Sequence, residues 1–226
     1  MARSVIVTGG FGILGEAVAR AFLDAGDKVA RIDFAPEAKC ALSDALDLGG
    51  VDLTDAASTG AALDRIAAAH GGIDVLVNVA GGFTWETLED GSIDAWARMH
   101  AMNLLTAATI TQLALPALKA SAAGRIVNIG AGAAVKAGMG MGAYAASKSG
   151  VHRLTEALAE ELAGTRVTVN AVLPSIIDTP TNRADMPDAD FSTWVQPAAI
   201  ADVIGFLSSS AARALTGALI PVTRGG

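Results

Sequence analysis

The sequence predicts an α/β fold, with a single doubly wound parallel sheet of about seven strands and helices on both faces. Short β-branched runs alternate with longer Ala- and Leu-rich stretches along nearly all 226 residues. Hydrophobic residues make up 52% of the chain and charged residues 17%, which excludes intrinsic disorder and fits buried strands under closely packed helices. No repeat or linker divides the sequence, so we expect residues 1–226 to form one domain.

Seven segments have strand-like composition, the third more weakly than the others, namely Ser4–Thr8, Lys28–Asp33, Gly50–Leu53, Ile73–Val79, Arg125–Ile129, Arg166–Val172 and Ala218–Val222. Five helical stretches lie between them, at about Gly12–Ala25, Asp55–His70, Ile93–Ala120, Ala143–Ala163 and Pro197–Ser209. Two long polar segments, Gly81–Ser92 and Ser175–Gln196, interrupt this alternation. Both follow strands, and ligands of such sheets bind beyond the carboxyl ends of the strands. We therefore expect these loops to border a pocket for a small-molecule substrate.

Charge and hydropathy limit the partners of the chain. Lys and Arg total 16 against 23 Asp and Glu, a formal charge of −7, so no basic stripe favours nucleic acid. The mean hydropathy of +0.45 raises the possibility of a membrane span. The longest uncharged stretch, Met99–Leu118, contains His100, Asn103, Gln112, three threonines and Pro116, which suits lipid poorly. We expect no membrane partner.

The cysteine and histidine content excludes two further kinds of site. Cys40 is the single cysteine, so an intramolecular disulfide is impossible. The three histidines have no Cys, His or acidic neighbours at ligand spacing, so we expect no metal site. The apolar run Ser4–Thr8 leads directly into glycines and does not resemble a signal peptide. We therefore expect a cytoplasmic protein.

The first predicted strand runs into a glycine-rich turn, Thr8-Gly9-Gly10-Phe11-Gly12-Ile13-Leu14-Gly15, within which a helix begins. In such a turn Gly9 permits the tight bend, Gly12 lets the backbone approach a pyrophosphate, and Gly15 lets helix and strand pack closely. The helix N-terminus offers free N–H groups to the anion. The turn predicts dinucleotide binding; a glycine-rich turn without a ligand is the alternative.

Asp33 closes the second predicted strand, 18 residues after Gly15. A carboxylate at this offset accepts hydrogen bonds from the adenosine ribose and repels a 2′-phosphate, so it favours NAD(H). Arg31 lies two positions earlier and should share the face of Asp33. Because Arg31 could attract a 2′-phosphate, use of NADP(H) remains open.

Tyr144 and Lys148 stand four residues apart in a predicted helix and so project from one face. An ammonium beside a phenol stabilises the phenolate and should lower the pKa of Tyr144 from its usual value near 10. A phenol tuned in this way can exchange a proton with a substrate atom that receives hydride. The alternative is a surface pair without a chemical role.

With this pair, the chain resembles the short-chain dehydrogenase/reductase family over essentially its whole length. The matching pieces follow one another in the family's order: the Thr8–Gly15 turn, Asp52, Asn78-Val79-Ala80-Gly81, Asn103, Tyr144 with Lys148, Pro174 through Thr179, and Thr216-Gly217 to Gly225-Gly226. The resemblance implies a Rossmann-type sheet, hydride transfer to or from nicotinamide, and assembly as dimers or tetramers.

The resemblance also implies roles for individual residues. Tyr144 would be the acid/base, Lys148 would hold the nicotinamide ribose and tune Tyr144, and Asn103 would support a water in a proton relay. Further positions would contact the cofactor: Gly9, Phe11, Gly12, Ile13, Leu14, Gly15, Asp33, Asp52 and Leu53 near the adenosine and pyrophosphate, Asn78, Ala80 and Gly81 beneath it, and Pro174, Ile177 and Thr179 at the carboxamide.

Three positions depart from the family pattern. The family usually places a serine 13 residues before the tyrosine, where it polarises the substrate carbonyl; here that position is Ala131. Ile13 and Ser175 stand where glycines are common. Loss of one preorganised donor can cost about 10²–10³ in rate when the reaction needs it. The substrate therefore either does not need that donor or receives one from elsewhere.

The dihydropteridine reductase branch of the family is similar in these departures and in the stretch Gly140–His152. The likeness is strongest in an irregular loop, through Leu173-Pro174, Asp178-Thr179-Pro180, Asn182-Arg183, Met186-Pro187, Ala189-Asp190-Phe191-Ser192 and Trp194. It implies NADH-dependent reduction of a quinonoid dihydropterin. Members of that branch do not generally carry an asparagine at the position of Asn103, which leaves reduction of ketones or 3-oxoacyl groups, or oxidation of secondary alcohols, as the alternative. A cofactor-binding sensor without catalysis is the third hypothesis.

Two features point to binding partners. Phe83, Trp85, Phe191 and Trp194 lie in the two long loops, where they could sandwich a planar substrate or anchor the loops. The predicted helices 93–120 and 143–163 carry apolar residues beyond one stripe, which predicts a homodimer or homotetramer through these helices.

Overall fold

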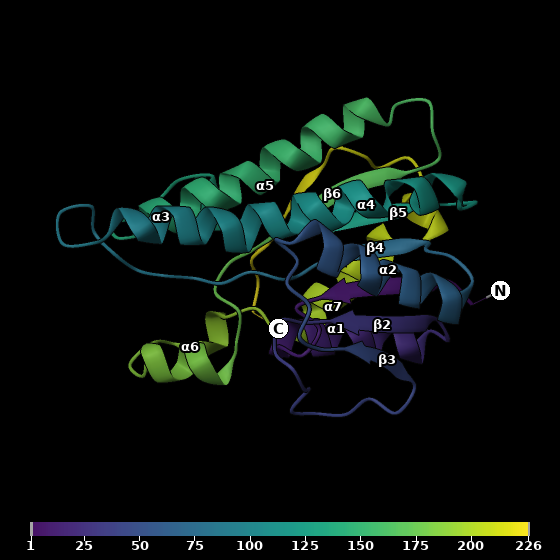
Figure 1. Cartoon of the computed structure of the whole chain (residues 1–226). Helices are drawn as coiled ribbons and strands as arrows, with labels where there is room; N and C mark the ends of the chain where they lie inside the picture. The colour runs from purple at the N-terminus through teal and green to yellow at the C-terminus, as the bar shows by residue number, and fades with distance from the viewer. Residues whose placement is uncertain (1, 226) are drawn as a thin grey trace.

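The fold is a seven-stranded parallel sheet, described here for residues 2–225 in a computed structural model (Figure 1). Its strands are β1 (Ser4–Thr8), β2 (Lys28–Ile32), β3 (Ala45–Leu48), β4 (Val75–Asn78), β5 (Arg125–Ile129), β6 (Thr168–Pro174) and β7 (Leu219–Val222). They lie in the order β3-β2-β1-β4-β5-β6-β7, and every pair is parallel. The predicted doubly wound α/β sheet is confirmed, and its order reverses between β1 and β4, where such sheets bind ligands.

Helices cover both faces of the sheet (Figure 1). They are α1 (Ile13–Asp24), α2 (Ala56–His70), α3 (Ile93–His100), α4 (Thr106–Ala120), α5 (Gly142–Glu161), α6 (Pro180–Asp185) and α7 (Pro197–Leu207). A π-helical turn, Ala101–Leu105, joins α3 to α4 without a break. The helices α1 and α7 pack on one face, and α2, α4 and α5 on the other.

Alternating residues of each strand supply two separate cores. Ile6 and Ile126 point into the cluster formed with α2, α4 and α5, whereas Val5 and Val127 point into the cluster formed with α1 and α7. These side chains are almost completely buried, and burial of each contributes about 1.5–3 kcal/mol. Because both faces of the central strands are apolar, these strands have continuous hydrophobic sequences, which is why their positions were predictable.

The third strand lies elsewhere than predicted. It is Ala45–Leu48, whereas the expected segment Gly50–Leu53 is a turn in which Gly50 adopts a φ of +72°. The strand pairs with β2 at the edge of the sheet and carries Asp47 outward. Its Ala, Leu and Asp residues are weak strand formers, so the pairing with β2 and not local preference makes it a strand.

The late segment 175–196, expected as a loop, contains ordered elements. Thr179 caps α6 through a bond from the amide of Asn182, and Pro180 occupies the first turn. A bridge pairs Ile177 with Val195. The carboxylate of Asp178 binds Arg183, which holds the pKa of Asp178 at about 2. These contacts fold the segment into a lobe at the carboxyl edge of the sheet.

The continuous helical run Ile93–Ala120 has the length and mean hydropathy, 1.3, of a membrane-crossing helix. In the fold it packs against α2 and α5. Asn103 and Thr111 lie buried on it and form hydrogen bonds within the protein. We therefore interpret this run as a helix that covers the sheet. It is long because the π-helical turn joins α3 and α4 without a break.

Candidate active site

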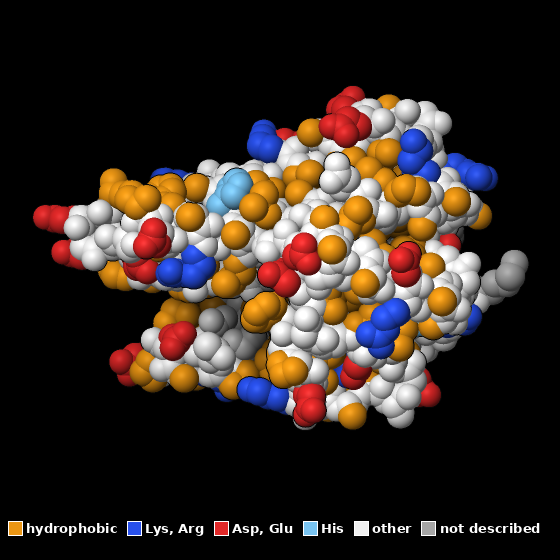
Figure 2. Space-filling view, viewed as in Figure 1, with side chains coloured by type: hydrophobic (Ala, Val, Ile, Leu, Met, Phe, Trp, Pro, Cys, Tyr) orange, Lys and Arg blue, Asp and Glu red, His pale blue; other side chains and the backbone are white. Residues whose placement is uncertain are grey.

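The carboxyl ends of the strands open into a hollow. At the left of Figure 2, the surface is indented between an arm, formed by residues 81–92 with α3, and the lobe that carries α6. The glycine-rich turn, the start of α5 and the end of β6 all lie at this edge of the sheet. The two long loops therefore border the hollow, as predicted from their places after strands.

The glycine-rich turn has the close approaches that its sequence predicts. Gly9 has a φ of +59°, and a side chain there would come within 2.9 Å of the backbone of Ala80. A side chain at Gly15 would collide with the carbonyl oxygen of Gly9. Gly12 precedes α1 without a side-chain cap, so it leaves the first N–H groups of that helix without a side-chain acceptor from the N-cap. This turn fits the pyrophosphate of a dinucleotide.

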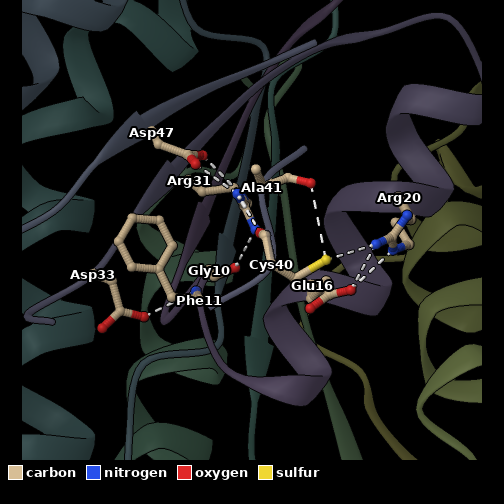
Figure 3. A network of polar contacts seen from close by, with 9 residues as sticks. All are labelled: Gly10, Phe11, Glu16, Arg20, Arg31, Asp33, Cys40, Ala41 and Asp47. Carbon is tan, nitrogen blue, oxygen red and sulfur yellow. Dashed lines mark hydrogen bonds and ion pairs between the residues drawn. The ribbon is translucent and has the colours of Figure 1, made fainter. Parts of the chain in front are cut away.

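Asp33 is fixed beside this turn, directly after β2. Its Oδ2 accepts a hydrogen bond from the amide of Phe11 at 3.0 Å, and its Oδ1 accepts one from the amide of Ala35 at 3.0 Å (Figure 3). Each carboxylate oxygen keeps a lone pair for a further donor. The arrangement suits the hydroxyl groups of an adenosine ribose.

Arg31, which left NADP(H) open on sequence grounds, is fully buried. Its guanidinium forms an ion pair with Asp47 at 2.6 Å and donates to the carbonyl oxygens of Gly10 and Cys40 (Figure 3). The charge that could attract a 2′-phosphate is therefore neutralised by the neighbouring strand. The guanidinium also lies over the ring of Phe11, 5.2 Å from its centroid.

Tyr144 and Lys148 lie one turn apart in the first two turns of α5, and Lys148 reaches the end of β5. The Nζ of Lys148 donates to the carbonyl oxygen of Ile129 at 2.8 Å, and burial lowers the pKa of Lys148 to about 8. Burial raises the pKa of Tyr144 to about 12. The prediction that Lys148 lowers the pKa of Tyr144 is wrong for this structure, because burial of the phenol is the dominant effect. The structure favours a protonated phenol.

Aromatic residues of the arm surround Tyr144. Phe83 meets its ring edge to face, with centroids 5.0 Å apart. Trp85 packs against Gly140, at which any side chain would collide with the indole, and the amide of Glu86 donates to the carbonyl oxygen of Gly140 at 2.9 Å. Both Phe83 and Trp85 remain more than half exposed and can contact a substrate.

The two aromatic residues of the lobe behave differently. Trp194 is buried and packs against Phe191, with ring centroids 4.7 Å apart. Arg183 lies over the ring of Phe191. These contacts favour the anchoring alternative for Trp194 over the prediction that it sandwiches a substrate.

Asn103 lies in the π-helical turn and reaches the arm. Its Oδ1 accepts from the amide of Gly82 at 2.9 Å, and its Nδ2 donates to the Gly82 carbonyl and to the Oγ of Ser147. Ser147 in turn donates to the carbonyl oxygen of Tyr144 at 2.7 Å. A side chain at Gly81 would collide with Asn103 and come within 3.4 Å of the Lys148 Nζ. Asn103, Gly81 and Lys148 are thus neighbours, and π-helical turns often mark functional sites.

Ser147 was not identified from the sequence, although its position offered a signal. It lies three residues after Tyr144, so the two are neighbours on the helix surface.

Ala131 follows β5 at the position where the family usually carries a serine. It is buried, and its amide donates to the Nε2 of His152 at 3.3 Å. A side chain at Gly130 would collide with the same imidazole. The prediction missed His152, although it lies four residues after Lys148 on the same helix face. No hydroxyl replaces the serine at this position.

On the adenosine side of the predicted site, Asp52 and Leu53 make contacts within the protein. Asp52 accepts hydrogen bonds from the amide and hydroxyl of Thr54, which lower its pKa. Leu53 is buried in the core, so only its backbone can meet a cofactor. Near the turn, Ile13 is about half exposed and Leu14 is buried.

The floor residues after β4 tie the sheet together. Asn78 donates to Thr111 and to Asn128, so its side chain points into the protein. The hydroxyl of Thr8 accepts from the amide of Ala80 at 3.0 Å and brings the end of β4 close to the glycine-rich turn.

On the lobe side, Pro174 ends β6, and Ile177 and Thr179 hold the lobe through the bridge to Val195 and the cap of α6. Within residues 2–225 no group of three or more His, Cys, Asp or Glu side chains is placed to hold a metal ion.

A family profile described as short chain dehydrogenase matches residues 3–190. The chain belongs to the short-chain dehydrogenase/reductase family. As a member of this family it is an oxidoreductase that binds NAD(P)(H), and the glycine-rich turn with Asp33 fits that cofactor.

Two known proteins are similar to this chain in sequence over nearly its whole length. The D-threitol dehydrogenase of Mycolicibacterium smegmatis is 33% identical, over 99% of this chain and 92% of that protein. A 3-oxoacyl-[acyl-carrier-protein] reductase of Salmonella typhimurium is 30% identical, over 99% and 96%. The likeness to dihydropteridine reductase therefore rests on the sequence motifs alone.

Two solved structures superpose over nearly the whole chain. The aldohexose dehydrogenase of Thermoplasma acidophilum, in ligand-free form, has a TM-score of 0.89 at 28% identity and covers 99% of this chain and 93% of its own. The 3-ketoacyl-(acyl-carrier-protein) reductase of Brucella melitensis, complexed with NADH, has a TM-score of 0.87 at 25% identity, with coverages of 97% and 96%.

Proposed function

We propose that this protein transfers hydride between NAD(H) and a small substrate, with NAD(H) preferred over NADP(H). The preference is supported by the carboxylate of Asp33 beside the glycine-rich turn and by the ion pair that neutralises Arg31. A 2′-phosphate at this place would meet the negative charge of Asp33, while the positive charge of Arg31 is already paired with Asp47.

Tyr144 is the acid/base of the proposed reaction. The observation that carries it is the placement of Tyr144 and Lys148 on one inward face of α5, at the carboxyl edge of the sheet. NADH, when bound, supplies a hydride. Tyr144, kept protonated by burial, donates the proton, and Lys148, whose amine is fixed on the carbonyl oxygen of Ile129, would hold the nicotinamide ribose. Asn103 positions the arm against α5 through Gly82.

For the substrate, we propose a planar heterocycle of the quinonoid dihydropterin type. The missing hydroxyl at Ala131 supports this, because such an electrophilic ring needs little polarisation of a carbonyl group. The exposed rings of Phe83 and Trp85, one of them against Tyr144, offer flat surfaces for stacking.

A second candidate is an ordinary ketone, a 3-oxoacyl group or a secondary alcohol. It is supported by Asn103, the residue to which the family pattern gives a proton relay, and by the relatives, which are named as dehydrogenases and acyl-carrier-protein reductases.

One assay distinguishes these functions. NADH oxidation is followed with a quinonoid dihydropterin and with a panel of ketones and 3-oxoacyl thioesters, and NAD⁺ reduction with secondary alcohols. We expect Tyr144→Phe to lower turnover about 10³-fold with the preferred substrate and to leave NADH binding, measured by fluorescence, unchanged. NADH binding without turnover on any substrate would indicate a cofactor-binding sensor and contradict the proposed enzyme.

We further propose a cytoplasmic homodimer or homotetramer. Assembly through helices 93–120 and 143–163 is supported by the partly exposed Leu105 and by a groove of about 550 Å³ between α4 and α5. A cytoplasmic location is supported by Cys40, a free thiol.

A further inference from the structure

A second cavity lies at the opposite edge of the sheet, where β1 and β5 begin. It has a volume of about 350 Å³ and is lined by Arg3, Ala123, Arg125, Ser208, Ser209 and Ser210. The N-terminus of the chain, at the right of Figure 1, marks this edge. The cofactor and the reacting groups belong to the carboxyl edge, so the proposed oxidoreductase function leaves this cavity unused.

Arg125 is a buried cation without a counter-ion in the described chain. Arg125 is only 4% exposed to solvent. No carboxylate among residues 2–225 lies within ion-pair distance of its guanidinium group. Its Nη1 donates to the carbonyl oxygens of Gly124, at 2.8 Å, and Arg166, at 3.2 Å, whereas its Nε has no hydrogen-bond partner there. A buried guanidinium without an anion is costly.

The nearby carboxylates are engaged elsewhere. Asp27 forms a two-pronged ion pair with Arg3. Asp74 accepts hydrogen bonds from the amide of Ser4 and the hydroxyl of Ser121. Neither neutralises Arg125, so the cavity keeps an uncompensated positive charge.

A second buried group supports a ligand at this place. Ser208 is 2% exposed, and its hydroxyl has no hydrogen-bond partner within residues 2–225, while its carbonyl oxygen accepts from Arg3. Burial, together with the neighbouring charge of Arg3, lowers the pKa of Arg125. An anion between these groups would satisfy the donors and remove the repulsion between the two guanidinium groups.

We propose that this cavity binds a phosphate-type oxyanion, with Arg125 and Ser208 as the principal donors. A guanidinium presents parallel N–H groups that match the oxygens of a phosphate, and such charge-assisted bonds are strong. Hydroxyl groups of the serine run 208–210 complete a set of neutral donors around the anion. The ligand is either free phosphate or the phosphate of a monoester.

Isothermal titration calorimetry at constant ionic strength tests this site, with inorganic phosphate in one arm and glycerol 2-phosphate in the other. We expect saturable 1:1 binding in at least one arm. Arg125→Gln should weaken it at least tenfold, because it removes the buried charge. Arg153→Gln is the matched control, since Arg153 lies exposed on α5 and pairs with Glu156. It should bind as the unmodified protein does.

Binding that persists unchanged in Arg125→Gln, or the absence of saturable binding in both arms, would overturn the proposal. Phosphate bound only at the glycine-rich turn gives the first of these results. If Arg125→Gln does not fold, as judged by circular dichroism, Ser208→Ala replaces it. Ser208→Ala should weaken phosphate binding at least threefold and leave the melting temperature in phosphate-free buffer unchanged. If Ser208→Ala binds phosphate as tightly as the unmodified protein does, the assignment is contradicted.

Discussion

The buried amine of Lys148 makes the active site a source of instability at neutral pH. The pKa of this group is about 8 in the folded protein against an ordinary value of 10.5, because burial disfavours its charged form. Between these two values the unfolded chain binds more protons than the folded one. The free energy of unfolding therefore rises as pH increases from 8 to 10.5, and below pH 8 the buried charge costs about 3 kcal/mol.

From this linkage we expect Lys148→Met to abolish turnover and to stabilise the protein at pH 7 by about 1–3 kcal/mol. The gain should shrink as the pH rises from 8 and approach zero only above pH 10.5, where the lysine becomes neutral in the unfolded chain as well. Urea unfolding at pH 7 and at pH 10 measures the difference. A gain of the same size at both pH values would show that packing, and not the charge, causes it.

Asp33 should determine which cofactor is used. Asp33→Ala removes an acceptor for the ribose and the negative charge that repels a 2′-phosphate, so we expect KM for NADH to rise about 10- to 100-fold and the preference over NADPH to fall. Asp44→Ala, at an exposed acid before β3 and thus at the opposite, amino edge of the sheet, is the control and should leave both constants unchanged. A native enzyme that already prefers NADPH would refute the assignment of Asp33.

Arg31 shows how far the sequence could resolve this choice. The spacing placed Arg31 and Asp33 on one strand and so left NADP(H) open. What neutralises Arg31 is Asp47, directly opposite it in the register of β2 with β3. That contact depends on an edge strand whose composition does not predict a strand, and it could not be found without the fold.

At the scale of elements, the π-helical turn, the arm and α5 meet at Gly81. A methyl group there would collide with Asn103 and approach the amine of Lys148. We expect Gly81→Ala to lower kcat at least tenfold and to destabilise the fold by about 1–3 kcal/mol, because these groups cannot all keep their positions.

Gly60→Ala is the matched control for this substitution. Gly60 lies inside α2 with open space at its Cβ position, so the change should leave kcat unaltered and stabilise the helix by about 0.5–1 kcal/mol. Steady-state kinetics and thermal unfolding measure both effects. Full activity in Gly81→Ala would contradict the close packing of this junction.

Local signals explain which elements were predictable. The strands at the centre of the sheet are buried on both faces and long enough for their composition to identify them. The lobe was expected as a loop, although Thr179 followed by Pro180 is a typical helix start. A six-residue helix has too few turns to show a period, and its stability comes from tertiary contacts such as the one between Asp178 and Gln196.

At the scale of the whole molecule, the two edges of the sheet carry different chemistry. The carboxyl edge gathers the glycine-rich turn, Asp33 and Tyr144, all of which the sequence identified, because motif spacing and strand order together place them. The amino edge gathers Arg3, Arg125 and Ser208, which are 205 residues apart at their extremes and share no motif. Only the completed fold brings them together.

The remaining prediction concerns assembly. The groove between α4 and α5 is lined by four apolar residues together with Gln112, Lys119 and Glu161. Leu105, at the start of α4, is partly exposed, and such apolar surface is usually covered by a partner. We expect light scattering to give a dimer or tetramer and Leu105→Glu to reduce the mass to a smaller species. Leu215→Glu, at a comparably exposed leucine outside both helices, should not. Leu105→Glu should act by burying a charge within the contact between subunits. A native protein that is monomeric at micromolar concentration would exclude this interface.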